Sequence, residues 1–358
     1  MRTQGTMRIH PPQASAPPAH SPFPEGWYFV ASRDELADGK LVCKTWLGEE
    51  IVAWSDGQGR VCMAEAYCPH LGSSLAPETG AKVCAGRLVC PFHGFEYDTS
   101  GQCVATPYAP PPKTARLRLY ETRDYAGMIF GWWGLGGRRA QWHLPEAPQA
   151  ESGWSDIRHT TLRFPGHPQE TTENAVDLAH LRYVHGYHNV SRTARLEIDG
   201  ACMVSRFDFM GTYRVAGVMG VTFDVSSITH VYGLGFSQVD FEERSIGYRA
   251  RLWVLSTPVD GTSIDLTLAT HVGDFERPKR AIVGLGFLPL RQRVNLMNRF
   301  ALWKARKYVE EDVVIWSRKR YLERPLLNRA DGEIIAYRRY CEQFYSEQAH
   351  RDERLIVG

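Results

Sequence analysis

Two nearly matching loops in the first third of the chain constrain its fold more than any other feature. They read C-P-H-L-G at residues 68–72 and C-P-F-H-G at residues 90–94, so each loop offers one thiolate and one imidazole. Four such side chains can share one metal centre only if both loops meet in space, which requires the chain around them to fold back on itself. The prolines stiffen the loops, and the glycines let backbone N–H groups come close to metal-bound sulfur.

The candidate ligands in these loops are Cys68, His70, Cys90 and His93. Two cysteines on one iron and two histidines on the other form the ligand set of a Rieske [2Fe–2S] centre, whose histidines raise its potential above that of an all-cysteine cluster. The alternative is a structural zinc site with the same ligand count. Zinc sites usually pair Cys with Cys and His with His, so the mixed pair in each loop favours the iron–sulfur cluster.

The loops lie in a region with the pattern of a small β domain. Short β-type runs at 27–30, 50–54 and 60–63 alternate with Gly and Asp turns, which predicts an antiparallel β domain. We place this domain at residues 26–145 and a second domain at 146–358. Residues 1–25 are rich in Pro, lack the apolar core of a signal peptide and are expected to be a flexible tail.

A second chemical motif occupies residues 173–185, E-N-A-V-D-L-A-H-L-R-Y-V-H. Two histidines with one carboxylate are the ligand set of non-haem Fe(II) oxygenases. In a helix, His180 and His185 would point roughly 140° apart, so both can bind one metal only if the helix is distorted or ends between them. Gly186 could end it. The alternative is a core helix with two hydrogen-bonded histidines.

The C-terminal half first turns strongly β, with mostly alternating runs at 203–209, 220–225, 248–254 and 264–269. The apolar side chains on one face of these runs predict an apolar ligand, although most of that face must be core and no pocket residue is assigned individually. This face includes Met203, Phe209, Phe223 and Trp253. Residues 290–319 then show helical spacing and carry three consecutive acids at 310–312.

Composition excludes several function classes. The 358 residues fit two domains, and a formal net charge of +2 gives no reason to expect nucleic acid or an anionic membrane as the partner. The apolar stretch 281–290 is interrupted by Gly and Pro and is too short for a transmembrane segment. Eight cysteines, two of them set beside histidine, indicate metal binding in a reducing compartment, so we expect a cytoplasmic protein.

The two loops, followed by Asn174-x-x-Asp177-x-x-His180-x-x-x-x-His185, resemble the oxygenase component of the Rieske non-haem iron ring hydroxylases. The resemblance implies an α+β chain: an N-terminal antiparallel β Rieske domain, and a C-terminal catalytic domain of helix-grip type, with an antiparallel sheet around a long helix. It also implies a third ligand to a mononuclear Fe(II) from an acid on that helix. Asp312 matches the pattern, with Glu311 as the alternative. One departure is a slightly longer interval between the cluster loops.

The same resemblance implies roles and partners. Asp177 would accept a hydrogen bond from His180 and reach His93 of a neighbouring subunit as an electron-transfer bridge, with Asn174 in support. The working unit would be a ring, most often a trimer. O2 would be the co-substrate. No complete Gly-x-Gly-x-x-Gly motif follows a strand, so electrons from NAD(P)H would arrive through a separate ferredoxin or flavin reductase.

A finer resemblance concerns the substrate. Segments 103–109, 167–174 and 338–345 are similar to those of the sterol- and steroid-acting group, the 3-ketosteroid 9α-hydroxylases and cholesterol 7-desaturases. This implies oxidation of an apolar polycyclic substrate by hydroxylation, desaturation or demethylation. The alternatives are a Rieske oxygenase acting on a smaller aromatic or other natural product, a Rieske electron carrier without oxygenase activity, and a zinc-stabilised sterol-binding module.

Overall fold

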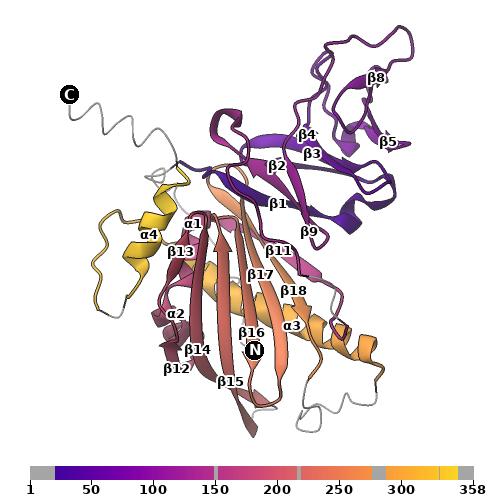
Figure 1. The fold of residues 1–358 in the computed structure, drawn as a ribbon. Helices are drawn as coiled ribbons and strands as arrows, with labels where there is room; N and C mark the ends of the chain where they lie inside the picture. Colours follow the sequence, from indigo (N-terminus) through magenta and orange to yellow (C-terminus); the bar gives the residue numbers. More distant parts are fainter. Residues whose placement is uncertain (1–20, 149–151, 216–218, 276–287, 330, 346–358) are drawn as a thin grey trace, which may run out of the picture.

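The structure is a computed structural model that describes residues 21–148, 152–215, 219–275, 288–329 and 331–345 (Figure 1). Residues 1–20 of the predicted tail lie outside the described residues. Glu25, at the end of that tail, is buried, and its backbone N–H donates to the carbonyl of Phe344 at 2.8 Å. The start of the described chain is therefore bonded to its end.

The N-terminal part is built from three small antiparallel sheets. The first joins β1 (Gly26–Ser32), β10 (Met128–Trp133) and β9 (Thr122–Tyr125), and the second joins β2 (Leu41–Trp46), β3 (Glu49–Ser55) and β4 (Val61–Glu65). The third joins β5 (Lys82–Cys84), β6 (Arg87–Val89), β7 (Glu96–Tyr97) and β8 (Cys103–Ala105). Three short 3-10 helices, η1 (Arg33–Gly39), η2 (Pro77–Thr79) and η3 (Leu135–Gly137), connect the strands.

Three of the hairpins use the same two-residue turn, in which a non-glycine residue is followed by glycine. Leu47-Gly48, Ala85-Gly86 and Ala126-Gly127 all have positive φ at both positions, as a type I′ turn requires. Leu47 adopts this unfavourable backbone conformation with its side chain fully buried. Packing of the Leu47 side chain therefore outweighs the local backbone preference.

The C-terminal part is dominated by one eight-stranded antiparallel sheet. Its order is β11-β18-β17-β16-β15-β14-β12, and β13 pairs with β14. The strands are β11 (Arg158–Pro165), β12 (His188–Arg192), β13 (Glu197–Asp199), β14 (Cys202–Val215), β15 (Met219–Tyr232), β16 (Phe236–Glu243), β17 (Tyr248–Pro258) and β18 (Ser263–Val272). The four runs predicted from 203 to 269 fall within β14, β15, β17 and β18.

The helix α3 (Leu290–Trp316) lies across this sheet (Figure 1). Its Val309 and Trp316 pack on Leu266 and Leu268 of β18, and burial of each of these two leucines contributes about 1.5–3 kcal/mol. The other helices are the short α1 (Pro168–Thr172), η4 (Glu173–Ala175), α2 (Leu178–Tyr183) and α4 (Ile334–Glu342). A large antiparallel sheet around one long helix confirms the predicted α+β, helix-grip fold class.

The two parts share an aromatic interface. Trp27 and Phe130 of the β1-β10-β9 sheet pack in one cluster with Phe236 and Trp253 of the large sheet. Within a single chain, the β5–β8 sheet and helix α2 lie at opposite ends of the molecule (Figure 1). In the described part of the chain, each helix is too short or too polar to cross a membrane.

Candidate metal centres

The two cysteine–histidine loops adopt the same backbone turn. In the first, the N–H of Gly72 donates to the carbonyl of Cys68 at 2.9 Å, and in the second, the N–H of Gly94 donates to the carbonyl of Cys90 at 3.1 Å. Both glycines have positive φ, which explains their presence at equivalent positions. At Gly94 a side chain would also collide with Pro107, so a third loop packs directly on the second.

The four candidate ligands are buried to different degrees. Cys68 and Cys90 are only 1% and 2% exposed, whereas the rings of His70 and His93 are half-buried and have centroids 4.8 Å apart. Phe95 stacks on His70 at 4.4 Å. The thiol groups therefore lie inside the domain and the imidazoles near its surface, a donor set that fits a [2Fe–2S] cluster with an accessible histidine side.

Tyr97, in β7, also belongs to this centre, although sequence reasoning did not select it. Its hydroxyl lies 3.0 Å from Sγ of Cys68. Burial and the contact with Cys68 raise the pKa of Tyr97, so its hydroxyl keeps its proton and can donate it to sulfur. Burial likewise raises the pKa of Cys68, so a thiolate at this position requires a metal cation. The sequence feature that could have indicated this role is the position of the tyrosine, four residues after His93.

A second group of ligand atoms converges between α2 and α3. One atom each of His180, His185 and Asp312 lies within 4.8 Å of the other two. Helix α2 ends at Tyr183, between the two histidines, and Gly186 follows with φ of 68°. The expected single helix is instead interrupted at Val176 and ends early, which allows both imidazoles to face one point.

Hydrogen bonds at Nδ1 orient the two rings. Nδ1 of His180 lies 2.6 Å from the backbone carbonyl of Asp177, and Nδ1 of His185 lies 3.4 Å from Oε2 of Glu311. A carbonyl only accepts, so His180 carries its proton on Nδ1, which leaves Nε2 for a metal. Nε2 of His185 faces Oδ2 of Asp312 at 3.4 Å. The three residues fit a mononuclear metal ion.

The two candidate acids on α3 have different surroundings. The side chain of Asp312 is 8% exposed and faces the Nε2 side of His185, whereas that of Glu311 is 53% exposed and faces the Nδ1 side. Burial lowers the pKa of His180. For His185, burial is opposed by Asp312 and Glu311, which together raise its pKa.

Asp177 corrects one detail of the sequence-based expectation. Its Oδ1 accepts hydrogen bonds from the backbone N–H groups of Ala179 at 2.9 Å and His180 at 3.2 Å, so the carboxylate caps α2. The ring of His180 therefore meets the Asp177 carbonyl and not its carboxylate, because the extended backbone of Asp177 directs the side chain to the helix N-terminus. Asn174 lies in η4, and in the described chain no hydrogen bond joins it to Asp177 or His180.

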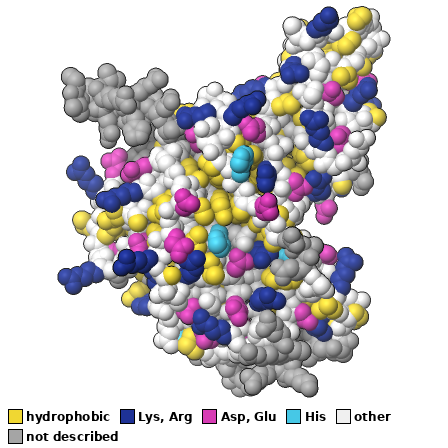
Figure 2. Space-filling model, in the orientation of Figure 1, with side chains coloured by type: hydrophobic (Ala, Val, Ile, Leu, Met, Phe, Trp, Pro, Cys, Tyr) yellow, Lys and Arg dark blue, Asp and Glu magenta, His cyan; other side chains and the backbone are white. Residues whose placement is uncertain are grey.

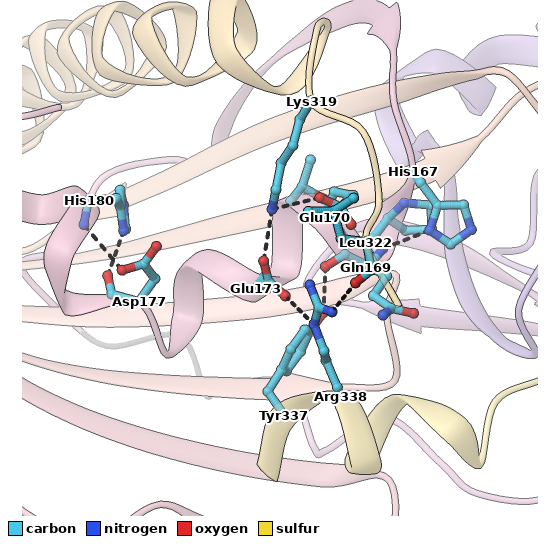
Figure 3. A network of polar contacts seen from close by, with 12 residues as sticks. His167, Gln169, Glu170, Glu173, Asp177, His180, Lys319, Leu322, Tyr337 and Arg338 are labelled. Atoms are coloured by element: carbon cyan, nitrogen blue, oxygen red, sulfur yellow. Dashed lines mark hydrogen bonds and ion pairs between the residues drawn. The ribbon is translucent and has the colours of Figure 1, made fainter. Parts of the chain in front are cut away.

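An ion-pair cluster includes two glutamates that lie shortly before Asp177 and His180 in the chain (Figure 3). Nζ of Lys319 is 2.6 Å from Oε2 of Glu170 and 2.8 Å from Oε1 of Glu173, and Nε of Arg338 is 3.2 Å from Oε2 of Glu173. Both glutamates are buried. Sequence reasoning missed this cluster, which we call the Lys319 cluster, because its two glutamates lie more than 140 positions before its lysine and arginine.

An aromatic group lies beside His185. Tyr187 stacks on Phe209 with centroids 4.5 Å apart, and Tyr308 meets the His185 ring at 5.3 Å. Phe223 also contacts Tyr187. Of the four apolar residues considered from sequence, Phe209 and Phe223 thus lie near the metal group, whereas Met203 and Trp253 are fully buried in separate core clusters.

Comparison with known families gives two matches that together cover most of the chain. A model described as the Rieske [2Fe-2S] domain matches residues 26–121, and a model described as the 3-Ketosteroid 9alpha-hydroxylase C-terminal domain matches residues 131–345. The first match contains the cysteine–histidine loops, and the second contains His180, His185 and Asp312.

Curated relatives extend over nearly the whole chain at low identity. Cholesterol 7-desaturase nvd 1 of Ciona intestinalis is 28% identical over 355 residues, covering 92% of this chain and 70% of the relative. The oxygenase component of 3-ketosteroid-9-alpha-monooxygenase from Mycolicibacterium smegmatis is 27% identical over 350 residues, covering 91% of this chain and 84% of the relative.

Solved structures share the fold. Dicamba monooxygenase bound to dicamba superposes with a TM-score of 0.64 at 16% identity, covering 91% of this chain and 98% of that one. The QL mutant of NdmA from Pseudomonas putida CBB5 with caffeine gives a TM-score of 0.66, also at 16% identity, with 91% of both chains covered. At this identity the likeness establishes the architecture alone.

Proposed function

Because the chain belongs to the Rieske oxygenases that carry the 3-ketosteroid 9alpha-hydroxylase C-terminal domain, we propose that it uses O2 to oxidise a C–H position of a sterol or steroid. The chain is an oxidoreductase of the Rieske type. The substrate class rests on the names of its relatives, which are cholesterol 7-desaturases and 3-ketosteroid-9-alpha-monooxygenases. The observation that carries the proposal is the convergence of His180, His185 and Asp312 beside an aromatic group.

The ligand roles follow from the two centres. Cys68, His70, Cys90 and His93 would hold a [2Fe–2S] cluster, and His180, His185 and Asp312 would hold Fe(II). When bound, these groups supply one-electron transfer and O2 activation. The protein contributes orientation: the Asp177 carbonyl and Glu311 fix the two imidazoles, and the half-buried rings of Tyr187 and Tyr308 limit water beside them.

We propose a ring of subunits, most simply a trimer, as the working unit. Within one chain, the cluster loops and α2 lie at opposite ends (Figure 1). A head-to-tail ring would bring the cluster of one subunit to the iron site of the next. Asp177 would then link His180 to His93 of the neighbouring subunit, because its backbone carbonyl accepts from the His180 ring and its carboxylate retains acceptor sites besides the helix cap for His93.

The remaining partners are also proposals. Electrons from NAD(P)H would arrive through a separate ferredoxin or flavin reductase, which the name "oxygenase component" of one relative supports. Basic and acidic side chains are interspersed on the face shown in Figure 2, so this face does not single out a docking site for such a partner. We keep the domain limits 26–145 and 146–358, with cytoplasmic location and Asn174 in a supporting role, as predictions.

The function can be tested by turnover of a sterol and steroid panel with a surrogate reductase, under air and under nitrogen, with products located by mass spectrometry and NMR. We expect O2-dependent oxidation of at least one tetracyclic substrate by protein showing the EPR signal of a reduced Rieske cluster. Turnover confined to small aromatic compounds would refute the substrate class. Protein that holds the cluster but consumes no O2 with any substrate would refute oxygenase activity.

A further inference from the structure

The Lys319 cluster joins the segment formed by α1 and η4 to the C-terminal part of the chain, more than 140 positions away. Glu170 belongs to α1 and Glu173 to η4, Lys319 follows α3, and Arg338 belongs to α4. In Figure 3 the carboxylate of Glu173 lies between Lys319 and Arg338, while Asp177 on the same segment lies beside His180. One carboxylate therefore holds two cations from two different elements.

On each of its two segments, the Lys319 cluster lies at the same sequence distance from a metal ligand. Glu173 lies seven residues before His180, and Lys319 lies seven residues after Asp312. The two segments thus approach each other at two points: the ligand atoms of His180 and Asp312 at one, and the Lys319–Glu173 ion pair at the other. Any displacement of one segment along the other must disturb both contacts.

The backbone transmits the position of Lys319 to α3. The N–H of Arg318 donates to the carbonyl of Ile315 at 3.0 Å, and the N–H of Lys319 donates to that of Trp316 at 3.2 Å. Helical turns therefore continue from Asp312 to Lys319 without a break, and anchoring Lys319 anchors the end of the helix. The competing anchor is apolar, since Trp316 stacks on Phe164 with centroids 6.0 Å apart.

Loss of the lysine would leave buried charge without its partner. The side chains of Glu170 and Glu173 are 12% and 9% exposed. Arg338 would still bond Glu173, but Glu170 would lose its lysine partner. Removing one member of a buried ion pair leaves an uncompensated buried charge, which destabilises the arrangement of the groups around it. Both glutamates lie in the segment that leads into His180.

We propose that Lys319 is a positioning residue for the mononuclear iron site, setting the separation of Asp312 from His180 through its contacts with Glu170 and Glu173. This inference rests on the proposed function, because it assumes that His180, His185 and Asp312 bind the metal. Lys319 itself touches neither metal nor substrate. Loss of Lys319 would lower the affinity of the mononuclear site for its metal before it affected the [2Fe–2S] cluster.

The test compares Lys319→Met and Lys319→Arg with wild type, using the full chain with its [2Fe–2S] cluster loaded. The matched control is Lys307→Met, which removes an exposed lysine of α3 that pairs with Glu310. The dissociation constant for Co(II) is measured anaerobically, with the visible ligand-field bands of bound Co(II) as a spectroscopic readout. We expect Lys319→Met to weaken binding about tenfold and to alter the bands, as removal of metal-site supporting residues does elsewhere. Lys319→Arg should restore most of the affinity, and Lys307→Met should leave it unchanged.

Equal Co(II) affinity in Lys319→Met and wild type would overturn the inference while leaving the proposed function intact. Equal losses in Lys319→Met and Lys307→Met would also overturn it. If Lys319→Met does not fold, Glu170→Gln removes one charge while Glu173 keeps its contact with Lys319, and a smaller loss of affinity with an unchanged cluster spectrum is expected. If Asp312→Ala binds Co(II) as tightly as wild type, the proposed metal site is refuted as well.

Discussion

Asp312 and Glu311 offer a direct test of which acid completes the iron site. In the structure, Asp312 is buried and faces Nε2 of His185, whereas Glu311 is half exposed and faces Nδ1 of the same ring. Loss of a residue that only supports a ligand lowers metal affinity about 10–100-fold, so loss of a ligand should lower it by more than about 100-fold. We therefore expect Asp312→Ala to lose the mononuclear iron and all turnover.

Glu311→Ala should cost less than loss of a usual supporting residue, because the contact of Glu311 with His185 is long, at 3.4 Å, and the Glu311 side chain is exposed. An exposed ion pair contributes about 0–1 kcal/mol, and 1 kcal/mol corresponds to a change of about fivefold in an equilibrium constant. This variant should retain its iron and lose no more than about fivefold in affinity. A larger loss would mean that the orientation of His185 depends on Glu311 more strongly than its exposure indicates.

The assay is anaerobic equilibrium dialysis against Fe(II), with iron and sulfide determined per chain and the cluster followed by visible absorption. Each wild-type chain should hold about three irons, two with the cluster and one with the mononuclear site. Asp312→Ala should hold about two, with the sulfide content unchanged. Retention of the third iron in Asp312→Ala together with its loss in Glu311→Ala would refute the assignment of Asp312.

Three other substitutions test separate parts of the molecule. Asp177→Asn should retain both metal centres but lose turnover, since the variant lacks the carboxylate proposed to contact His93 of the neighbouring subunit, and full activity with intact iron content would exclude that role. Tyr97→Phe removes a hydrogen-bond donor to the Cys68 sulfur. It should lower the reduction potential of the [2Fe–2S] cluster by roughly 40 mV, which is equivalent to about 1 kcal/mol for one electron. Voltammetry that shows no shift would contradict this. Burial lowers the pKa of Lys44 to about 8 from 10.5. Between these pH values the unfolded chain binds more protons than the folded chain. The contribution of Lys44 to the free energy of unfolding therefore rises with pH in this window, by at most about 3 kcal/mol. Urea unfolding should accordingly show Lys44→Met losing stability relative to wild type between pH 8 and 10, and a constant difference would show that Lys44 is solvated.

The sequence by itself determined the features that depend on local spacing. The turns at 68–72 and 90–94 are formed by Pro and Gly within each loop, and the β runs from 203 to 269 follow from alternation within each strand. The long helix was predicted at 290–319 and is observed at Leu290–Trp316, because its apolar spacing is a property of the segment alone. These features are encoded by residues that are neighbours in the chain.

Only the tertiary structure decided which distant side chains face each other. Asp312 and Glu311 are adjacent acids on one helix, and their different exposure arises from how α3 packs against the sheet and α2. Lys319 meets Glu173 across 146 positions, and Tyr97 meets Cys68 across 29. No local pattern predicts such contacts, since they follow from packing over the whole chain. The same holds for Asp177, whose carboxylate was free to bond either the helix N-terminus or the imidazole until the backbone conformation was known.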